Sequence, residues 1–282
     1  MIGDAKKTRR VVVLSDVHLG HAATQVNEVK FLGPLLEGAD EVIFNGDTCE
    51  QTVSAWREKG RAQLAELKLL CARLGAEARF LTGNHDPDVD GEGWVDLRGG
   101  QIFVTHGDMI LSDVAPWSLE CIERRERIRE VVEEFKGDVS TLDGLHRRTQ
   151  LVEEELRPSE EPRLGSKGRM YLWTALWPPM RPLNILRVWL TMFAKAERFT
   201  ERFRPTSEVF LFGHFHRPGI RRRGSRIYCN TGAFMRGARA LMVELEGEWM
   251  TVRAIIRDKD GYFRPGDSCG SFRLRDQLSR SR

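Results

Sequence analysis

The chain has 282 residues, of which 41% are hydrophobic and 30% are charged, so it can bury the core of a globular protein. Its 44 basic and 41 acidic residues leave a net charge of only +3, and overall charge therefore says little about its partners. Five cysteines without a Cys-x-x-Cys pair argue against a disulfide framework or a structural zinc site. The first apolar run, Val11 to Leu14, is too short for a signal peptide or a membrane span, so we expect a cytoplasmic protein.

Strand and helix patterns alternate through the N-terminal third of the chain. Short apolar runs predict strands at residues 9–16, 41–45 and 78–82, and helical spacing predicts helices at 26–36 and 54–74. The second helix is expected to begin at a Ser54 cap and to end before Gly75. Strands that alternate with helices in this way predict right-handed crossovers and a mostly parallel sheet.

The pattern changes after a hairpin expected at residues 94–97 and 101–105. Helices are expected next, at 119–135, 141–156 and 183–203, with a charged linker at 158–168. Strands return at 208–212, 226–230, 240–245 and 250–256, before a tail rich in glycine, serine and arginine that we expect to be loosely ordered. We predict an α/β core of residues 1–114 and 206–257, a helical insertion at 115–205 and a tail at 258–282.

Five of the strand-like runs are followed by aspartate, asparagine or histidine at the same end. These segments are Asp16-Val-His18, Gly46-Asp47, Gly83-Asn84-His85-Asp86, His106-Gly107 and Gly213-His214-Phe-His216. Ligands gather at the carboxyl ends of strands in α/β sheets, and residues two apart point to the same side. Each segment alone also fits a turn or a hydrogen-bonded core histidine. The ordered set predicts a metal site in which Asp47 bridges two ions.

The expected donors at this site are carboxylates, imidazoles and one amide oxygen. This set favours Mn²⁺, with Fe or Zn²⁺ as alternatives, and it is too rich in nitrogen for Ca²⁺ or Mg²⁺. Two such cations would lower the pKa of a bridging water and hold both oxygens of an in-line displacement at phosphorus. The donor set therefore points to hydrolysis of phosphate esters.

As an ordered set, these segments resemble the calcineurin-like metallophosphoesterase superfamily over residues 1–114 and 206–256. The resemblance implies a four-layer αββα sandwich with a helical lid insertion, and it implies two metal ions. When the ligand pattern of the family is carried over segment by segment, one ion is bound by Asp16, His18, Asp47 and His216. The pattern assigns to the other ion Asp47, Asn84, His106 and His214.

The resemblance also implies two catalytic roles beside the ligands. His85 follows Asn84 and is expected to donate to the leaving oxygen or to the phosphoryl group. In this family the Gly-Asp motif often carries a second acid three residues later, which here is Glu50, and we expect Glu50 to orient His85. The alternative for Glu50 is a solvated loop acid. Asp86 is expected to stabilise its loop.

The substrate has to be inferred from the insertion. Residues 170–193 combine tryptophans and leucines with arginines, which fits a lipid-binding lid or an interfacial surface; the alternative is packing onto the core. With this insertion, Asp16-Val-His-Leu-Gly, Thr-His106-Gly-Asp108 and Gly-His214-Phe-His216-Arg-Pro resemble the bacterial UDP-2,3-diacylglucosamine diphosphatases of lipid A synthesis. That group usually has arginine where this chain has His85.

This narrower resemblance implies a nucleotide-linked lipid that is cut at a phosphorus of its pyrophosphate. It also implies peripheral contact with the inner face of the membrane through residues 170–193. The expected substrate contacts are Asn84, His85, Asp113, Trp173, Trp177 and Arg181.

Three other classes stay open. A phosphomonoesterase or protein phosphatase would need no apolar lid, and a cyclic-nucleotide phosphodiesterase would use the same metals. A nuclease would use the basic run Arg221-Arg-Arg and the basic tail, although the balanced net charge favours a solvated face. A non-catalytic scaffold is disfavoured because every expected ligand position is filled.

Overall fold

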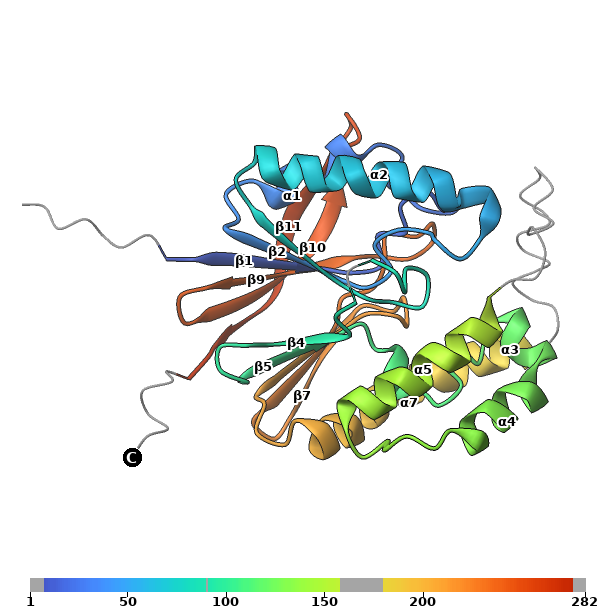
Figure 1. Ribbon diagram of the computed structural model, residues 1–282. Helices are drawn as coiled ribbons and strands as arrows, with labels where there is room; N and C mark the ends of the chain where they lie inside the picture. Colours follow the sequence, from blue (N-terminus) through green and yellow to red (C-terminus); the bar gives the residue numbers. More distant parts are fainter. Residues whose placement is uncertain (1–7, 90, 158–179, 276–282) are drawn as a thin grey trace, which may run out of the picture.

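Two mixed β-sheets lie face to face at the centre of the computed structural model, which describes residues 8–89, 91–157 and 180–275 (Figure 1). The first sheet has the strand order β11-β10-β9-β1-β2-β3. Its strands are β1 (Arg10–Leu14), β2 (Glu41–Asn45), β3 (Glu77–Leu81), β9 (Leu241–Glu246), β10 (Trp249–Arg257) and β11 (Phe263–Arg273). β1, β2 and β3 run parallel, whereas β9 pairs antiparallel with β1.

The second sheet has the order β4-β5-β6-β8-β7. Its strands are β4 (Trp94–Leu97), β5 (Ile102–Thr105), β6 (Val209–Phe212), β7 (Gly219–Arg223) and β8 (Arg226–Asn230). β5, β6 and β8 are parallel, and the two outer strands are antiparallel to their neighbours. The carboxyl ends of β5 and β6 therefore lie together, as do those of β1, β2 and β3 in the first sheet.

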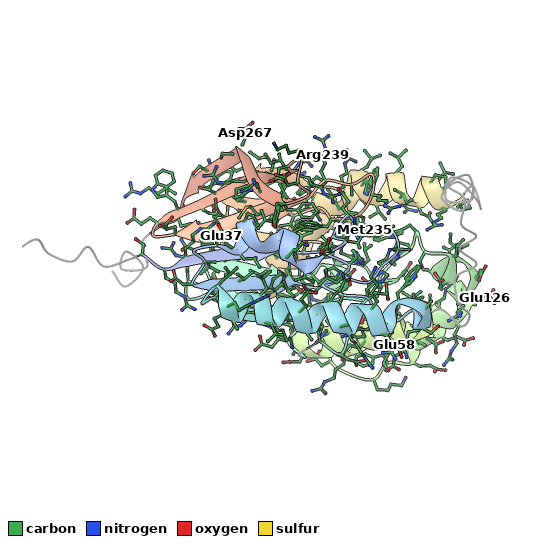
Figure 2. The ribbon with its side chains drawn as sticks, turned by 90° about the horizontal axis from the view of Figure 1, so that it is seen from above. Glu37, Glu58, Glu126, Met235, Arg239 and Asp267 are labelled. Carbon is green, nitrogen blue, oxygen red and sulfur yellow. The ribbon has the colours of Figure 1, made fainter. Side chains whose placement is uncertain are left out.

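Helices cover the outer face of each sheet. The short helices η1 (Val29–Leu32) and α1 (Gly33–Leu36), with α2 (Ser54–Arg73), lie over the first sheet, and α5 (Leu142–Leu156) and α7 (Met180–Phe203) lie on the side of the second (Figure 1). Seen from above, Glu58 on α2 and Asp267 on β11 lie at opposite edges of the molecule (Figure 2). The predicted four-layer αββα sandwich is confirmed.

Three apolar clusters hold the four layers together. One lies between the two sheets, and one lies between each sheet and the helices that cover it. Val13, Ile43 and Leu211 belong to the cluster between the sheets, while Phe44 packs under α2. Phe210 stacks in the cluster between the second sheet and α7. Burial of a large apolar side chain contributes about 1.5–3 kcal/mol, so these clusters fix the positions at which the strands end.

The helical insertion follows Val114 in the chain. Its first helices, α3 (Leu119–Glu123) and α4 (Arg125–Glu134), join α5 around a small core that contains Cys121, Ile128 and Val152. α7 then turns Val188, Met192, Ala196 and Phe199 toward the second sheet. In the described part of the chain, no helix is long and apolar enough to cross a membrane.

Several local expectations differ from the structure. Residues 26–36 form two single-turn helices rather than one, and Ser54 is the first residue of α2 rather than its cap, which is Val53. β7 was not expected, because its three exposed arginines hide the strand pattern. The expected loose tail contains β11, an edge strand whose backbone pairs with β10 while most of its side chains are exposed, so it lacks apolar alternation.

Candidate metal centre

The chain leaves the strand ends through strained turns. Seven non-glycine residues have positive φ in the described part of the chain, and five of them come from the segments predicted to bind metal: Asp16, His18, Asp47, His214 and His216, with φ between 50° and 67°. Residues other than glycine rarely adopt this conformation, which costs about 1–3 kcal/mol each and concentrates at functional sites. The surrounding fold therefore holds these side chains in place at an energetic cost.

Four side chains form the first donor group. Asp16, His18, Asp47 and His216 each offer an atom within 4.8 Å of the others. Nε2 of His216 lies 3.2 Å from Asp16 Oδ1 and 3.2 Å from His18 Nε2. His18 Nε2 lies 3.6 Å from Asp47 Oδ2. Asp16, His18 and Asp47 are buried, whereas His216 is 34% exposed, so this group opens to solvent on the His216 side.

Asp47, His106 and His214 form the second donor group. Nδ1 of His106 donates to the Asn45 carbonyl at 3.1 Å, which leaves Nε2 unprotonated in the neutral ring, 3.3 Å from Asp47 Oδ2. His214 Nε2 donates to the Val114 carbonyl at 2.9 Å and leaves Nδ1 as its free donor atom. Oδ2 of Asp47 thus faces both groups, while its Oδ1 accepts the His85 backbone N–H at 2.8 Å.

Unpartnered polar atoms show that these groups fit metal ions. Asn84 Oδ1 and His106 Nε2 are buried and have no hydrogen-bond partner in the structure, which is costly unless something binds them. Two ligand atoms about 2.1 Å from one cation, at a tetrahedral angle, lie about 3.4 Å apart. The distances of 3.2–3.6 Å between neighbouring donor atoms match this spacing.

The protonation states of His18 and His214 also favour metal binding. Burial lowers the pKa of His18 well below its usual value and lowers that of His214 to about 4, so both rings are neutral and have a lone pair to donate. Burial also acts against a charge on His106, but the neighbouring Asp47 carboxylate outweighs it and raises the pKa of His106. A divalent cation would displace that proton.

Glycines in the motifs allow the loops to approach the donors closely. A Cβ at Gly46 would lie 2.4 Å from Cγ of His106, and a Cβ at Gly213 would lie 2.2 Å from Oδ2 of Asp16. No real Cβ contact is that short, so only glycine fits at either position. The Gly-Asp and Gly-His pairs of the sequence therefore have a steric cause.

Asp86 stabilises the loops of β2 and β3, as expected. Its carboxylate accepts backbone N–H groups from Asp47, Thr48 and Gly83 at 2.7–3.0 Å. These bonds tie the two strand ends to each other and fix Asp47 relative to Asn84.

His85 and Glu50 form a pair beside the donors. His85 Nδ1 lies 2.8 Å from Oε2 of Glu50, and Glu50 is fully buried while His85 is 31% exposed. The other carboxylate oxygen of Glu50 accepts the backbone N–H groups of Thr52 and Val53. Burial lowers the pKa of His85, but the charges of Glu50 and Asp47 outweigh burial and raise that pKa to about 10. His85 is thus held as a hydrogen-bond donor.

The expected substrate contacts outside the strand ends are scattered. Asp113 is exposed and directly precedes Val114. Arg181 is half-buried, and its Nε donates to the Trp117 carbonyl at 3.0 Å, which fastens the start of α7 to the loop after η2 (Asp108–Ile110). Trp173 and Trp177 lie outside the described residues.

His21 was missed as a site residue. Its ring centroid lies 5.9 Å from that of His18 and 6.4 Å from that of His85. The only indication in the sequence is its place three residues after His18, since no strand ends directly before it.

The fold and the buried His/Asp cluster define a metal-dependent phosphoesterase. The chain belongs to the calcineurin-like phosphoesterase family, because the model of that family matches residues 9–218. No curated protein gives a significant match.

The comparison with solved structures gives matches at low sequence identity. The phosphoesterase YfcE from E. coli is 15% identical, with a TM-score of 0.42 over 94% of this chain and 100% of its own. A predicted phosphoesterase from Streptococcus pneumoniae is 14% identical, with a TM-score of 0.41 over 95% and 99%. Vps29 from Entamoeba histolytica in complex with Zn²⁺ is 12% identical, with a TM-score of 0.40 over 94% and 98%.

Proposed function

We propose that this phosphoesterase hydrolyses a phosphodiester or pyrophosphate bond in a lipid-linked nucleotide such as UDP-2,3-diacylglucosamine. The observation that carries the lipid part of this proposal is an exposed apolar surface on α7 that is bonded to the metal-binding loop. The proposal has three parts: the metal ligands, the residues that meet the phosphoryl group, and the apolar surface.

The proposed ligands are the six residues of the two donor groups together with Asn84. Asp16, His18 and His216 hold one cation, Asn84, His106 and His214 hold the other, and Asp47 is shared. When bound, two divalent cations supply a water of lowered pKa and a positive field for the charge that develops on the phosphoryl oxygens. Mn²⁺ is the favoured ion, with Fe or Zn²⁺ as alternatives.

His85 is the proposed donor to the phosphoryl group or to the leaving oxygen. Glu50 fixes its ring through Nδ1, so Nε2 remains available to the substrate. A positioned donor of this kind contributes about 10²–10⁴-fold to the rate. Asn84, Asp113, Arg181, Trp173 and Trp177 complete the proposed substrate contacts.

The apolar stripe consists of Met180, Leu183, Leu186 and Leu190, spaced three and four residues apart on α7. These side chains are 51–69% exposed. Next to the stripe, the indole N–H of Trp189 donates to the Phe215 carbonyl at 3.0 Å, between His214 and His216. Trp189, one residue before Leu190, therefore ties α7 to the metal-binding loop.

Cationic side chains flank the stripe. The Arg217 guanidinium lies 5.2 Å above the Trp189 ring, and that of Arg221 lies 5.3 Å above the Phe193 ring. Apolar side chains edged by arginine are typical of surfaces that bind anionic lipids. Such a surface would hold the acyl part of a substrate whose phosphates reach the metals.

A combined variant tests this assignment. Changing Leu183, Leu186 and Leu190 to Gln should lower kcat/KM for a micellar lipid-linked nucleotide more than tenfold, because about 0.8 kcal/mol is lost per buried CH₂. The water-soluble diester bis(p-nitrophenyl) phosphate should be cleaved as before. Leu69→Gln on α2 is the matched control, since Leu69 is 64% exposed in a different layer.

Two results would contradict the proposal. The first is that the combined variant loses the same fraction of kcat/KM on both substrates, or loses none on either. The second is that the wild-type protein prefers a phosphomonoester or a cyclic nucleotide. A nuclease has less support, because Arg221 lies on Phe193 and Arg223 pairs with Glu197 at 3.1 Å. These arginines are therefore engaged on α7 rather than aligned for a phosphate backbone.

A further inference from the structure

His21 is a histidine at the metal centre that belongs to neither proposed donor group. It is partly exposed, and its ring faces the rings of both His18 and His85 edge-on. His85 and His216 are the other partly exposed histidines of the site. These three rings are therefore the histidines of the site that solvent reaches.

The hydrogen bond to His21 fixes its tautomer. The backbone N–H of Ala23 donates to Nδ1 of His21 at 2.9 Å, and a backbone N–H can only donate. Nδ1 must then carry a lone pair, so the neutral ring has its proton on Nε2. The ring thus offers Nε2–H as a hydrogen-bond donor.

The loop holds this donor rigidly against α2. The His21 ring packs on Trp56 with centroids 4.2 Å apart. A Cβ at Gly20, where φ is +89°, would lie 2.6 Å from the Gly60 nitrogen, and a Cβ at Gly60 would lie 2.4 Å from the Glu50 carbonyl oxygen. Two glycines in close contact therefore allow the loop to lie on the helix backbone, which keeps His21 in one position.

We propose that His21 Nε2–H donates a hydrogen bond to the phosphoryl group next to the one that is cut. This inference rests on the proposed function, in that the substrate contains a pyrophosphate. His85 is the proposed donor to the scissile phosphoryl group, and the His21 ring lies 6.4 Å from the His85 ring and outside both donor groups. The group that His21 reaches is therefore one step farther along the substrate. His21 would distinguish a pyrophosphate from a single phosphate ester.

Two isosteric variants separate the two ring nitrogens. In His21→Asn, the amide oxygen replaces Nδ1 as acceptor for Ala23, but no group replaces Nε2. In His21→Gln, the amide nitrogen replaces Nε2 as donor. Both variants are compared with the metal-loaded wild-type protein. Inorganic pyrophosphate and inorganic phosphate are used as competitive inhibitors of bis(p-nitrophenyl) phosphate hydrolysis, with Mn²⁺ in excess.

We expect His21→Asn to raise the inhibition constant of pyrophosphate about tenfold and to leave that of phosphate within twofold, because one hydrogen bond to a charged group is lost. His21→Gln should retain most of the pyrophosphate affinity. Equal shifts for both inhibitors, no shift for either, or a fall in bound metal in both variants would overturn the inference. Failure of the wild-type protein to cleave an esterified pyrophosphate would sink the proposed function instead, and the inhibitor comparison would still decide the role of His21.

Discussion

The metal centre and the outer face of α7 are built in opposite ways. The metal centre is buried and strained, and its donors come from the ends of five strands in two sheets. The face of α7 is an ordinary helix surface in which leucines are exposed without backbone strain. The first region tolerates little change because each donor depends on the others. The second can change one side chain at a time, so under the proposed function the reaction and the choice of substrate would be separable.

Asp47→Asn is the strongest test of this separation. Since Oδ2 of Asp47 faces both donor groups, we expect activity on every substrate to fall about a thousandfold or more, together with the metal content. Metal analysis and turnover of both soluble and lipid-linked substrates measure this. Asp143→Asn, at an exposed position on α5, is the control. If Asp47→Asn keeps full activity on one substrate class, the metal centre does not serve all substrates alike.

His85→Ala should have the next largest effect. It removes the proposed donor without removing a ligand, so we expect turnover to fall about 10²–10⁴-fold while two ions stay bound. The loss should be similar on soluble and lipid-linked substrates. If the metal content falls instead, His85 has been misassigned and belongs to the metal shell.

Glu50→Gln should act more weakly and through His85. The amide keeps the shape and one hydrogen bond but loses the charge that pairs with the imidazole. We expect kcat to fall about tenfold with KM changed less than twofold, as for loss of one charge-assisted hydrogen bond. If kcat of the double variant Glu50→Gln/His85→Ala is no lower than kcat of His85→Ala alone, Glu50 acts only by positioning His85. Additive losses would assign Glu50 a separate role.

Trp189→Phe should have the smallest effect and tests the contact between the two regions. It keeps an aromatic ring beneath Arg217 but removes the N–H that donates to Phe215. We expect about a fivefold rise in KM for the lipid-linked substrate, which corresponds to one neutral hydrogen bond. Hydrolysis of bis(p-nitrophenyl) phosphate should change less than twofold. A uniform loss would show that α7 positions the metal loop itself.

The sequence predicted the gathering of the strand-end side chains better than the elements around them, and the reason is local. Asp16, Asp47, Asn84, His106 and His214 each follow a short apolar strand, so the motif and its place in the sheet are encoded in the same few residues. The Glu50–His85 contact was also expected, and the two side chains lie 2.8 Å apart.

Features that depend on distant partners were not predicted. β7 is a strand because it pairs with β8, not because of its own arginine-rich sequence. β11 similarly depends on its pairing with β10. His21 reaches the site because Gly20 meets Gly60, forty residues later. The contact between Gly20 and Gly60 cannot be predicted from the sequence pattern of either segment.

The carbonyl of Val114, which comes directly before the helical segment that starts the second half of the family match, accepts a hydrogen bond from Nε2 of His214 at 2.9 Å. A change in the segment after Val114 would leave this hydrogen bond in place, provided that it keeps the residues of α7 that pack on the second sheet and Trp189, which donates to the Phe215 carbonyl. A deletion that begins one residue earlier would remove the acceptor that orients His214.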